Sequence, residues 1–516
     1  MLLSQNIHVE DLSTMFKKNH SDVWWALPET LFSLCRRRRR HRPVAVRRPL
    51  LLGFRRCLRS KRLKPFSFPS LMKNFHHYVI YHSLLFISFG MRHAQVSPDM
   101  HNQEPFWKVG HQPTLVCALL YFTFSFMVWV LLGALGNYIA SDFGLSPFEK
   151  GLMIALPILS GSLLRLVMGP MADIIGAKKT GMVGLALTLA PLAGGWLWAD
   201  SVGRIYVVGL MLGIAGASFA VAMPMASRWY PQRHQGMVLG IVGAGTLGAF
   251  VAMLLAPRLA EVFGWRAVFG IAAIVLLAVM VVFVLVVRDA PRKVEAPKLS
   301  EYSNLFKEKD AYLFCLFYSV TFGGFVGLAS FLPVMLWDQY QISKVQAGEW
   351  AAVCVFSGGI LRPLGGWLAD RVGGIRVLIG VYILAAMSAW LAAGCSSLGA
   401  CVLLMVLVLG SFGIGNGAVF QLVPQRFSKQ IGTATSIVGT AGGLGGFLLP
   451  LIFGELKQIT GSYSSGLYGL AGCSVLALFI LLVVQHKWIG LWVGEGGMAR
   501  RAASIFPEET LKTETL

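Results

Sequence analysis

Two stretches of the sequence, residues 151–180 and 348–377, match one another without a gap when one is shifted by 197 positions. The shift pairs Ser160-Gly161 with Ser357-Gly358, Arg165 with Arg362, Gly169 with Gly366, and Asp173 with Asp370. The chain therefore contains an internal duplication. Each copy carries one arginine in the middle of a segment that is otherwise apolar and long enough to cross a bilayer.

Apolar segments of this length make up most of the chain beyond residue 110. With 55% hydrophobic and only 13% charged residues, the 516-residue chain is too apolar for a soluble protein. A helix needs about 20 residues to cross a hydrocarbon core of about 30 Å. Twelve segments meet this length, near residues 114–138, 151–171, 180–199, 203–227, 236–258, 266–287, 311–336, 347–369, 375–395, 399–423, 432–455 and 466–485. The sequence predicts an all-α membrane protein, embedded in a lipid bilayer, with two pseudo-symmetric six-helix halves.

The predicted domain order follows from this pattern and from the distribution of charge. It is an N-terminal extension (1–110), a first half (111–288), a cytoplasmic linker (289–310), a second half (311–487) and a cytoplasmic tail (488–516). The extension holds 19 Lys and Arg against 6 Asp and Glu, so it carries most of the net charge of +21. Because this charge is not spread over a folded surface, we expect no nucleic-acid partner.

The extension has two open interpretations. A run of arginines around Arg36 to Arg48 cannot pack a core, and it would stay disordered or lie on anionic lipid as a polybasic arm. The alternative is upstream sequence before a true start at Met91 or Met100. We favour this second interpretation, because the ordered pattern begins only near Trp107.

Basic residues gather in alternate loops between the twelve segments. These loops contain Lys178, Lys179, Arg228, Arg233, the run from Arg288 to Lys309, Arg371, Arg376, Arg426 and Lys429. Cytoplasmic loops of membrane proteins are enriched in Lys and Arg, so both termini are predicted to be cytoplasmic. We expect a multi-pass protein of the cell (inner) membrane that works as a monomer.

The loops after the second and eighth segments carry a duplicated motif. It is Gly169-x-x-Ala172-Asp173-x-x-Gly176-x-Lys178-Lys179 in the first copy and Gly366-x-x-Ala369-Asp370-Arg371-x-Gly373 in the second. Here the chain resembles the major facilitator superfamily, although Ile174 stands where the family usually has arginine. The resemblance implies a gate in which an acid at a helix end pairs with a basic residue or a helix N-terminus. The predicted gating residues are Asp173, Lys178, Lys179, Asp370 and Arg371.

The two arginines inside the repeat indicate an anion site. An arginine at the centre of a membrane helix costs roughly 2.5–3.5 kcal/mol on insertion scales. No Asp or Glu lies well inside the twelve segments, so Arg165 and Arg362 have no acid to pair with. Two unpaired guanidinium groups favour a planar anion with delocalised charge. The sequence shows no catalytic set, no metal-ligand spacing and no cofactor motif.

Three further stretches sharpen the identity of the anion. Residues 213–220, 318–327 and 413–426, together with the glycine-rich fifth and eleventh segments, are similar to the nitrate/nitrite porter family. The resemblance implies that Arg165 and Arg362 bind the substrate and that Phe219, Tyr318 and Phe322 stack on it. It also places Asn416 in the site, and Thr246 where the family usually has asparagine. The glycines expected to pack helices closely are Gly240, Gly243, Gly245, Gly439, Gly442 and Gly443.

The sequence predicts a nitrate transporter, with nitrite as a second substrate, that works by alternating access. Nitrate/nitrite exchange and proton symport both stay open as coupling modes, and the missing buried carboxylate disfavours a conventional proton relay. A facilitator for another small anion, such as a carboxylate, is the alternative. A sensor would need a soluble output domain and a redox enzyme would need paired intramembrane histidines, and the sequence has neither.

Overall fold

A computed structural model of the protein describes residues 109–231, 235–290, 307–427 and 431–498, together with Phe106 and Leu305. All of these residues belong to one compact unit, Asn102–Leu516. The predicted extension up to residue 105, most of the predicted linker and the last 18 residues of the predicted tail lie outside the described residues.

Helices make up the first half. They are α4 (Gln112–Trp129), α5 (Leu131–Ala134), α6 (Gly136–Phe143), α7 (Pro147–Ile174), α8 (Ala177–Leu197), α9 (Val202–Gly216), α10 (Phe219–Ser227), α11 (Gln235–Gly243), the short turn η5 (Ala244–Leu247), α12 (Gly248–Phe263) and α13 (Trp265–Val286). Several of these pieces join end to end, so that six helical rods result.

The second half repeats this arrangement. It contains α15 (Lys309–Tyr318), η6 (Ser319–Gly323), α16 (Gly324–Tyr340), α17 (Lys344–Val372), α18 (Gly374–Ala393), α19 (Leu398–Arg426), α20 (Ile431–Thr460), α21 (Ser464–Trp488) and the short turn η7 (Glu495–Gly497). Within the described residues, twelve helices are long and apolar enough to cross a membrane, which confirms the predicted number. An even number of crossings puts residues 112 and 488 on the same side.

The two copies of the repeat begin and end alike. A capping box opens each one, with Ser146 and Glu149 at the start of α7 and Ser343 and Gln346 at the start of α17. Each helix ends before a glycine with a positive φ, 97° at Gly176 and 102° at Gly373, a backbone conformation that L side chains rarely adopt. These caps fix the length of the two helices that carry Arg165 and Arg362.

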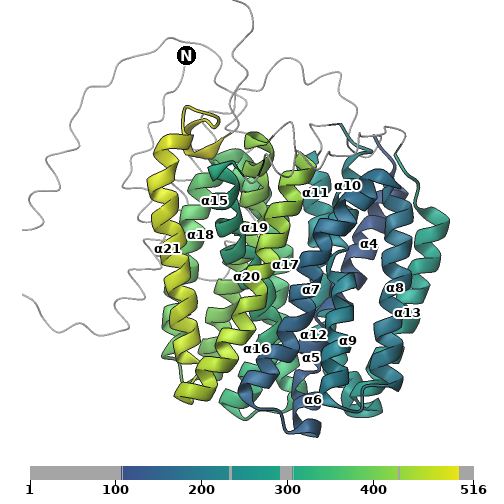
Figure 1. Ribbon diagram of the computed structural model, residues 1–516. Coiled ribbons are helices and arrows are strands. Elements are labelled where there is room, and N and C mark those ends of the chain that lie inside the picture. Colours follow the sequence, from purple (N-terminus) through teal and green to yellow (C-terminus); the bar gives the residue numbers. More distant parts are fainter. Residues whose placement is uncertain are drawn as a thin grey trace, which may run out of the picture. The chain divides into compact units, whose positions relative to one another are not determined.

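The two halves meet along four long helices. Figure 1 shows α7 and α12 of the first half, in blue and teal, beside α17 and α20 of the second half, in green. The contacts pair α7 with α20 and α12 with α17, as a pseudo-two-fold arrangement requires. Arg165 and Arg362 thus lie on helices at the boundary between the halves.

The halves make close contacts at one end of this boundary, which we call the Gly144 end after the glycine between α6 and α7. A Cβ atom on Gly151 would collide with the backbone of Pro450, and one on Gly348 would collide with Pro257 and the Met253 carbonyl. Because Gly151 and Gly348 are equivalent in the repeat, the halves touch through the same kind of contact twice. We call the opposite end the Gly176 end.

The same end holds hydrogen bonds and an ion pair between the halves. Asn137 in α6 donates its side-chain amide to the carbonyl of Pro333 in α16 at 3.0 Å, and the amide of Phe148 in α7 donates to Gln458 in α20 at 3.3 Å. Arg258 in α12 pairs with Glu349 in α17 at 2.6 Å. The described halves are therefore held together at the Gly144 end by backbone, amide and ionic contacts.

Three of the six helical rods in the first half, and one in the second, are interrupted halfway. The interruptions fall at Ala217–Ser218 between α9 and α10, at the 3-10 turn η5, at the π-helical turn η6, and at Val130 and Leu135 in the first rod. Irregular turns of this kind change the direction in which side chains point, and they are common at functional sites. Phe219, Thr246 and Phe322 all lie in or next to one of them, at the depth of the two arginines.

Candidate functional site

Arg165 and Arg362 lie in the middle of α7 and α17 and are both buried. The side chain of Arg165 is fully buried, and that of Arg362 is 5% exposed. Arg165 carries its charge 18 residues from the first residue of a 28-residue helix, and Arg362 occupies the equivalent position in the second copy. The structure therefore places two cations in the centre of an apolar bundle.

Neutral groups hold Arg165. Its Nε donates to the carbonyl of Gly216 at 3.1 Å, and its Nη1 donates to the carbonyl of Gly439 at 2.7 Å. Gly216 belongs to the first half and Gly439 to the second, so this side chain bridges the halves. The remaining terminal nitrogen, Nη2, is buried and has no hydrogen-bond partner among the described residues.

A single hydroxyl holds Arg362. Its Nη2 donates to the Tyr318 hydroxyl at 3.2 Å, whereas its Nη1 is buried without a partner among the described residues. Each arginine thus keeps one buried terminal nitrogen without a described hydrogen-bond partner. Because a buried unpaired donor costs about 1–3 kcal/mol, and more when it is charged, an acceptor bound to both groups would stabilise the protein.

Aromatic rings line the space between the arginines. The Phe219 ring centroid lies 5.2 Å from the Cζ atom of Arg165 and 5.7 Å from that of Arg362. Phe322 lies 5.1 and 5.8 Å from the same two atoms. Tyr318 stacks on Phe322 with a centroid distance of 5.0 Å and an interplanar angle of 3°. The structure therefore brings together Arg165, Arg362, Phe219, Tyr318 and Phe322, five of the expected substrate-binding residues.

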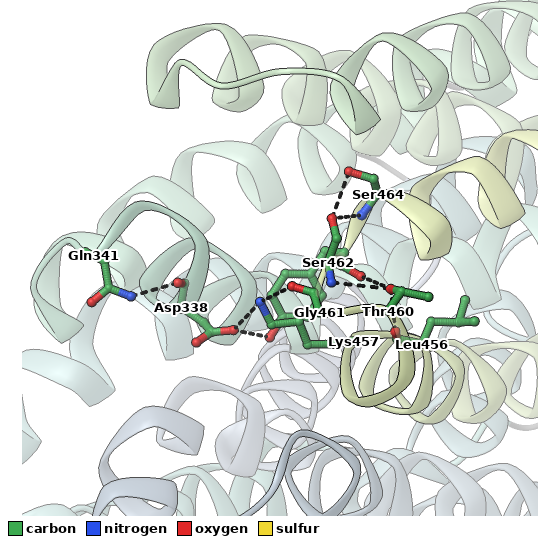
Figure 2. Close-up of polar contacts among 9 residues, drawn as sticks. Asp338, Gln341, Leu456, Lys457, Thr460, Gly461, Ser462 and Ser464 are labelled. Carbon is green, nitrogen blue, oxygen red and sulfur yellow. Dashed lines mark hydrogen bonds and ion pairs between the residues drawn. The ribbon is translucent and has the colours of Figure 1, made fainter.

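Within the part of the chain that the structure describes, neither arginine has an acid as a partner. The ion pairs among the described residues lie at the ends of the helices, and none includes Arg165 or Arg362. Figure 2 shows one of these pairs, in which Lys457 of α20 lies 3.3 Å from Asp338 at the end of α16. Tyr463 also donates to Asp338, and burial together with this carboxylate raises the pKa of the Tyr463 phenol. The described ion pairs thus lie at helix ends, and neither of the two charges in the middle belongs to one.

Two predicted site residues are buried without a described contact to an arginine side chain. The hydroxyl of Thr246 donates to the carbonyl of Gly243 at 3.1 Å, and a Cβ on Gly243 would lie 3.2 Å from the Nε of Arg362. Asn416 lies one helical turn before Phe420 on α19, and its side-chain oxygen has no hydrogen-bond partner among the described residues. Thr246 is thus linked to Arg362 only through Gly243. The side-chain oxygen of Asn416 is a hydrogen-bond acceptor without a described partner.

The predicted gating residues behave differently in the two copies. Asp173 pairs with Arg228 just beyond α10, and the two side chains are only 13% and 19% exposed. Asp370 is exposed and has no ion pair among the described residues, while Arg371 lies 4.0 Å from the Trp367 ring. Lys178 contributes its backbone amide, which donates to Asp289 at 2.9 Å; no described ion pair includes the side chain of Lys178 or Lys179. Among the described residues, an ion pair of the motif's aspartate is therefore present in the first copy and not in the second.

Three of the six predicted packing glycines leave no room for a side chain, and a fourth, Gly243, has little. A Cβ would collide with the Phe122 ring at Gly245, the Tyr318 ring at Gly442 and the Ser162 side chain at Gly443, and would press on Arg362 at Gly243. Gly240 and Gly439 have ordinary contact space, with the nearest atoms at 3.6 and 3.5 Å. The closest packing around these glycines therefore involves Phe122, Tyr318 and Ser162.

Sequence reasoning missed two aromatic residues of the site. Trp129 at the end of α4 places its ring 5.1 Å from the Cζ atom of Arg165. Phe420 in α19 lies 4.8 Å from the Tyr318 ring and 5.8 Å from the Phe219 ring. The spacing from Asn416 to Phe420, one helical turn, would have suggested Phe420; nothing in the repeat points to Trp129, because its equivalent in the second half is Val326.

Comparison with known proteins identifies a family. The model of the Major Facilitator Superfamily matches residues 117–450, which covers most of the described bundle. Two relatives are similar to this chain over most of its length. The nitrite extrusion protein of Bacillus subtilis (strain 168) is 35% identical over 363 residues, 70% of this chain and 91% of the relative. The probable nitrate/nitrite transporter NarK2 of Mycobacterium tuberculosis (strain H37Rv) is 33% identical over 388 residues, 71% of this chain and 95% of the relative.

A third relative is similar to the same extent. The probable nitrate transporter NarT of Staphylococcus epidermidis (strain RP62A) is 32% identical over 376 residues, 70% of this chain and 94% of the relative. The relatives are thus matched over nearly their whole length.

Proposed function

Because the chain belongs to the Major Facilitator Superfamily, we propose that it carries nitrate, and nitrite as a second substrate, across a membrane by alternating access. The family and the names of its relatives identify a transporter and not an enzyme. The observation that carries the substrate class is the pair of buried, unsatisfied guanidinium nitrogens, Nη2 of Arg165 and Nη1 of Arg362. The names of the three relatives support nitrate and nitrite within this class.

The proposed site suits a small planar anion. Nitrate has three equivalent oxygens in one plane, so it can accept from both free N–H groups at once. The Phe219 and Phe322 rings lie 6.4 Å apart at an interplanar angle of 35°. A planar group stacked on both faces needs about 7 Å, at about 3.5 Å per contact, so a small opening of the two rings admits it.

The proposed transport cycle follows from the two like charges. Arg165 and Arg362 repel one another in a medium of low dielectric constant, and a bound anion offsets this repulsion. Arg165 also donates to Gly439 in the other half, so any movement of the halves changes the surroundings of the anion. The anion would then favour the closed arrangement of the halves, which allows an exchange cycle in which the carrier returns loaded.

We further propose that the Gly176 end faces the cytoplasm of a cell whose inner membrane holds the protein. Basic residues at that end include Lys178, Arg228, Arg371 and Arg426, as the positive-inside rule requires. The Asp173–Arg228 pair would stabilise one closed arrangement at this end, as the motif implies.

Nitrate uptake into proteoliposomes tests the substrate. Arg165→Lys and Arg362→Lys keep the charge but remove the planar donor fork, so each should lower kcat/KM by about tenfold to a hundredfold. Arg204→Lys is the matched control, because Arg204 is an exposed arginine that pairs with Asp200 four residues earlier. Near-normal uptake by both site variants would refute anion binding by the two guanidinium groups.

Two variations of this assay separate the remaining possibilities. Excess formate or acetate should leave nitrate uptake unchanged, and strong competition by a carboxylate would favour the alternative substrate class. An imposed pH gradient without internal nitrite tests the coupling. Uptake driven by that gradient would indicate proton symport, whereas uptake only into vesicles loaded with nitrite would indicate exchange.

A further inference from the structure

Trp129 packs along the face of α7 that carries Arg165. Pro157, Gly161 and Arg165 follow one another at intervals of four residues, so they share one face of this helix. The indole N–H of Trp129 donates to the carbonyl of Pro157 at 2.7 Å. Its ring contacts the guanidinium group of Arg165, with 5.1 Å between the centroid and Cζ. The indole therefore extends along the helix from Pro157 to the arginine.

The position of this indole is tightly constrained. The side chain is 1% exposed, and a Cβ on Gly161 or on Gly216 would collide with its ring. Phe126 packs against it edge-on, with a centroid distance of 5.2 Å and an interplanar angle of 88°. Gly216 is also the residue whose carbonyl accepts from Arg165, so one glycine contacts both side chains. A fixed ring next to a charged group restricts that group to one orientation.

Among the described rings, Trp129 differs from the other aromatic neighbours of Arg165. Phe219 and Phe322 lie near both arginines, whereas the Trp129 contact is made to Arg165 alone. The equivalent position in the second half is Val326, and Phe325 packs against Gly358, the counterpart of Gly161. The second half thus has a ring in the corresponding space, but no described contact joins that ring to Arg362.

We propose that Trp129 is the positioning residue for Arg165, a role that rests on the proposed function of Arg165 as an anion-binding group. The indole face compensates the guanidinium charge in place of an acid. An acid there would neutralise the arginine and compete with the substrate anion, whereas a ring stabilises the cation and leaves Nη2 free. Trp129 would therefore raise the affinity for the anion without touching it.

A double-mutant cycle in nitrate affinity tests this role. Affinity is measured on the full-length protein in detergent, as the stabilisation by nitrate of the thermal unfolding midpoint. Trp129→Leu removes the ring and should weaken nitrate binding by roughly tenfold or more. Trp129→Phe keeps a ring but loses the bond to Pro157, so it should give an intermediate loss. In an Arg165→Lys background the change to leucine should add less than about twofold, and in Arg362→Lys the full loss should remain.

Phe325→Leu is the matched control. Phe325 is fully buried in the equivalent space of the second half, so its truncation should lower the unfolding midpoint while nitrate affinity stays within about twofold. An equal affinity loss for Trp129→Leu in both arginine backgrounds would show a purely structural role and overturn the proposal. So would wild-type affinity in Trp129→Leu.

Thermal unfolding of the same variants without nitrate tests the positioning of Arg165 independently of its proposed role in anion binding. The substitutions of Trp129 and Arg165 should change the unfolding midpoint non-additively when combined. Those of Trp129 and Arg362 should change it additively. If wild type does not respond to nitrate but this coupling is present, the proposed substrate is wrong and the positioning of Arg165 stands. Additive effects for both pairs would overturn the positioning role itself.

Discussion

Arg165 and Arg362 occupy equivalent positions in a duplicated helix, yet different groups hold them. Arg165 donates to two backbone carbonyls and contacts an indole, whereas Arg362 donates to one tyrosine hydroxyl. Tyr318 has an equivalent in the first half, Tyr121, but that ring packs against Phe283 and has no described contact with an arginine. The duplication has thus kept the two charges and changed their supports. Arg165 is fixed by the backbone, and Arg362 depends on a side chain that one substitution can remove.

The largest effect should come from removing that side-chain support. Tyr318→Phe leaves the Nη2 of Arg362 without its hydroxyl partner while the ring stack on Phe322 remains. A hydrogen bond to a charged group is worth about 1.5–3 kcal/mol, so nitrate affinity should fall by about tenfold to a hundredfold. Nitrate uptake as a function of concentration measures this loss.

Tyr121→Phe is the control for this change, because Tyr121 is the buried tyrosine at the equivalent position. The nitrate affinity of this variant should stay within about twofold of that of the wild type. Equal losses in the two variants would mean that the supports of the arginines do not differ as described.

Two glycines on α20 extend the comparison to backbone packing. A Cβ on Gly442 would collide with the Tyr318 ring, and a Cβ on Gly439 has 3.5 Å to the Phe219 ring and 3.9 Å to Arg165. Gly442→Ala should therefore destabilise the protein by about 1–3 kcal/mol and displace the support of Arg362. Gly439→Ala should be tolerated. Thermal unfolding in detergent compares the two, and the reverse order would contradict the packing around Tyr318.

A smaller difference is expected at the Gly176 end, between the two copies of the gating motif. Asp173→Asn breaks the half-buried pair with Arg228, which we expect to be worth about 1–2 kcal/mol. Asp370→Asn should have little effect on stability, because Asp370 has no described ion pair. The unfolding midpoint of each variant is measured alone and in combination with Arg228→Gln. The difference gives the coupling of each aspartate to Arg228. A loss that persists for Asp173→Asn when Arg228 is already replaced would contradict the pairing.

The smallest expected effect concerns selectivity on the Arg362 side. Thr246→Asn introduces an amide fork beside Gly243, the residue next to the Nε of Arg362. The ratio of nitrate to nitrite affinity should change by about threefold, since the new group offers one further weak donor. Competition between the two anions in the uptake assay measures this ratio. An unchanged ratio would remove Thr246 from the site.

The sequence predicted the two arginines and the number of helices for a physical reason, whereas Phe219, Tyr318 and Phe322 were expected only from the family resemblance. An arginine in an apolar segment and a stretch of about 20 apolar residues are local features, and both are visible without a fold. The partners of Arg165 are not local. Gly216, Gly439 and Trp129 come from three helices, and two of the three contribute a backbone carbonyl that any residue type possesses.

Equivalent positions of the duplication do not all have equivalent roles. The capping boxes match in the two copies, whereas Tyr121 differs from Tyr318 and Trp129 differs from Val326. Side chains that point into the space between the halves experience different neighbours in the two copies, so their roles diverge first.

The glycine contacts at the Gly144 end have a mechanical consequence. At Gly151 and again at Gly348 the halves touch with no side chain on the glycine, against Pro450 and Pro257. Because proline lacks an amide hydrogen, neither contact involves a hydrogen bond from that residue that rotation would break. If the halves rock as the proposed alternating access requires, these two contacts, one on each helix pair, would define the rotation axis. Small shifts there would be magnified along the 28- and 29-residue helices into larger displacements at the Gly176 end.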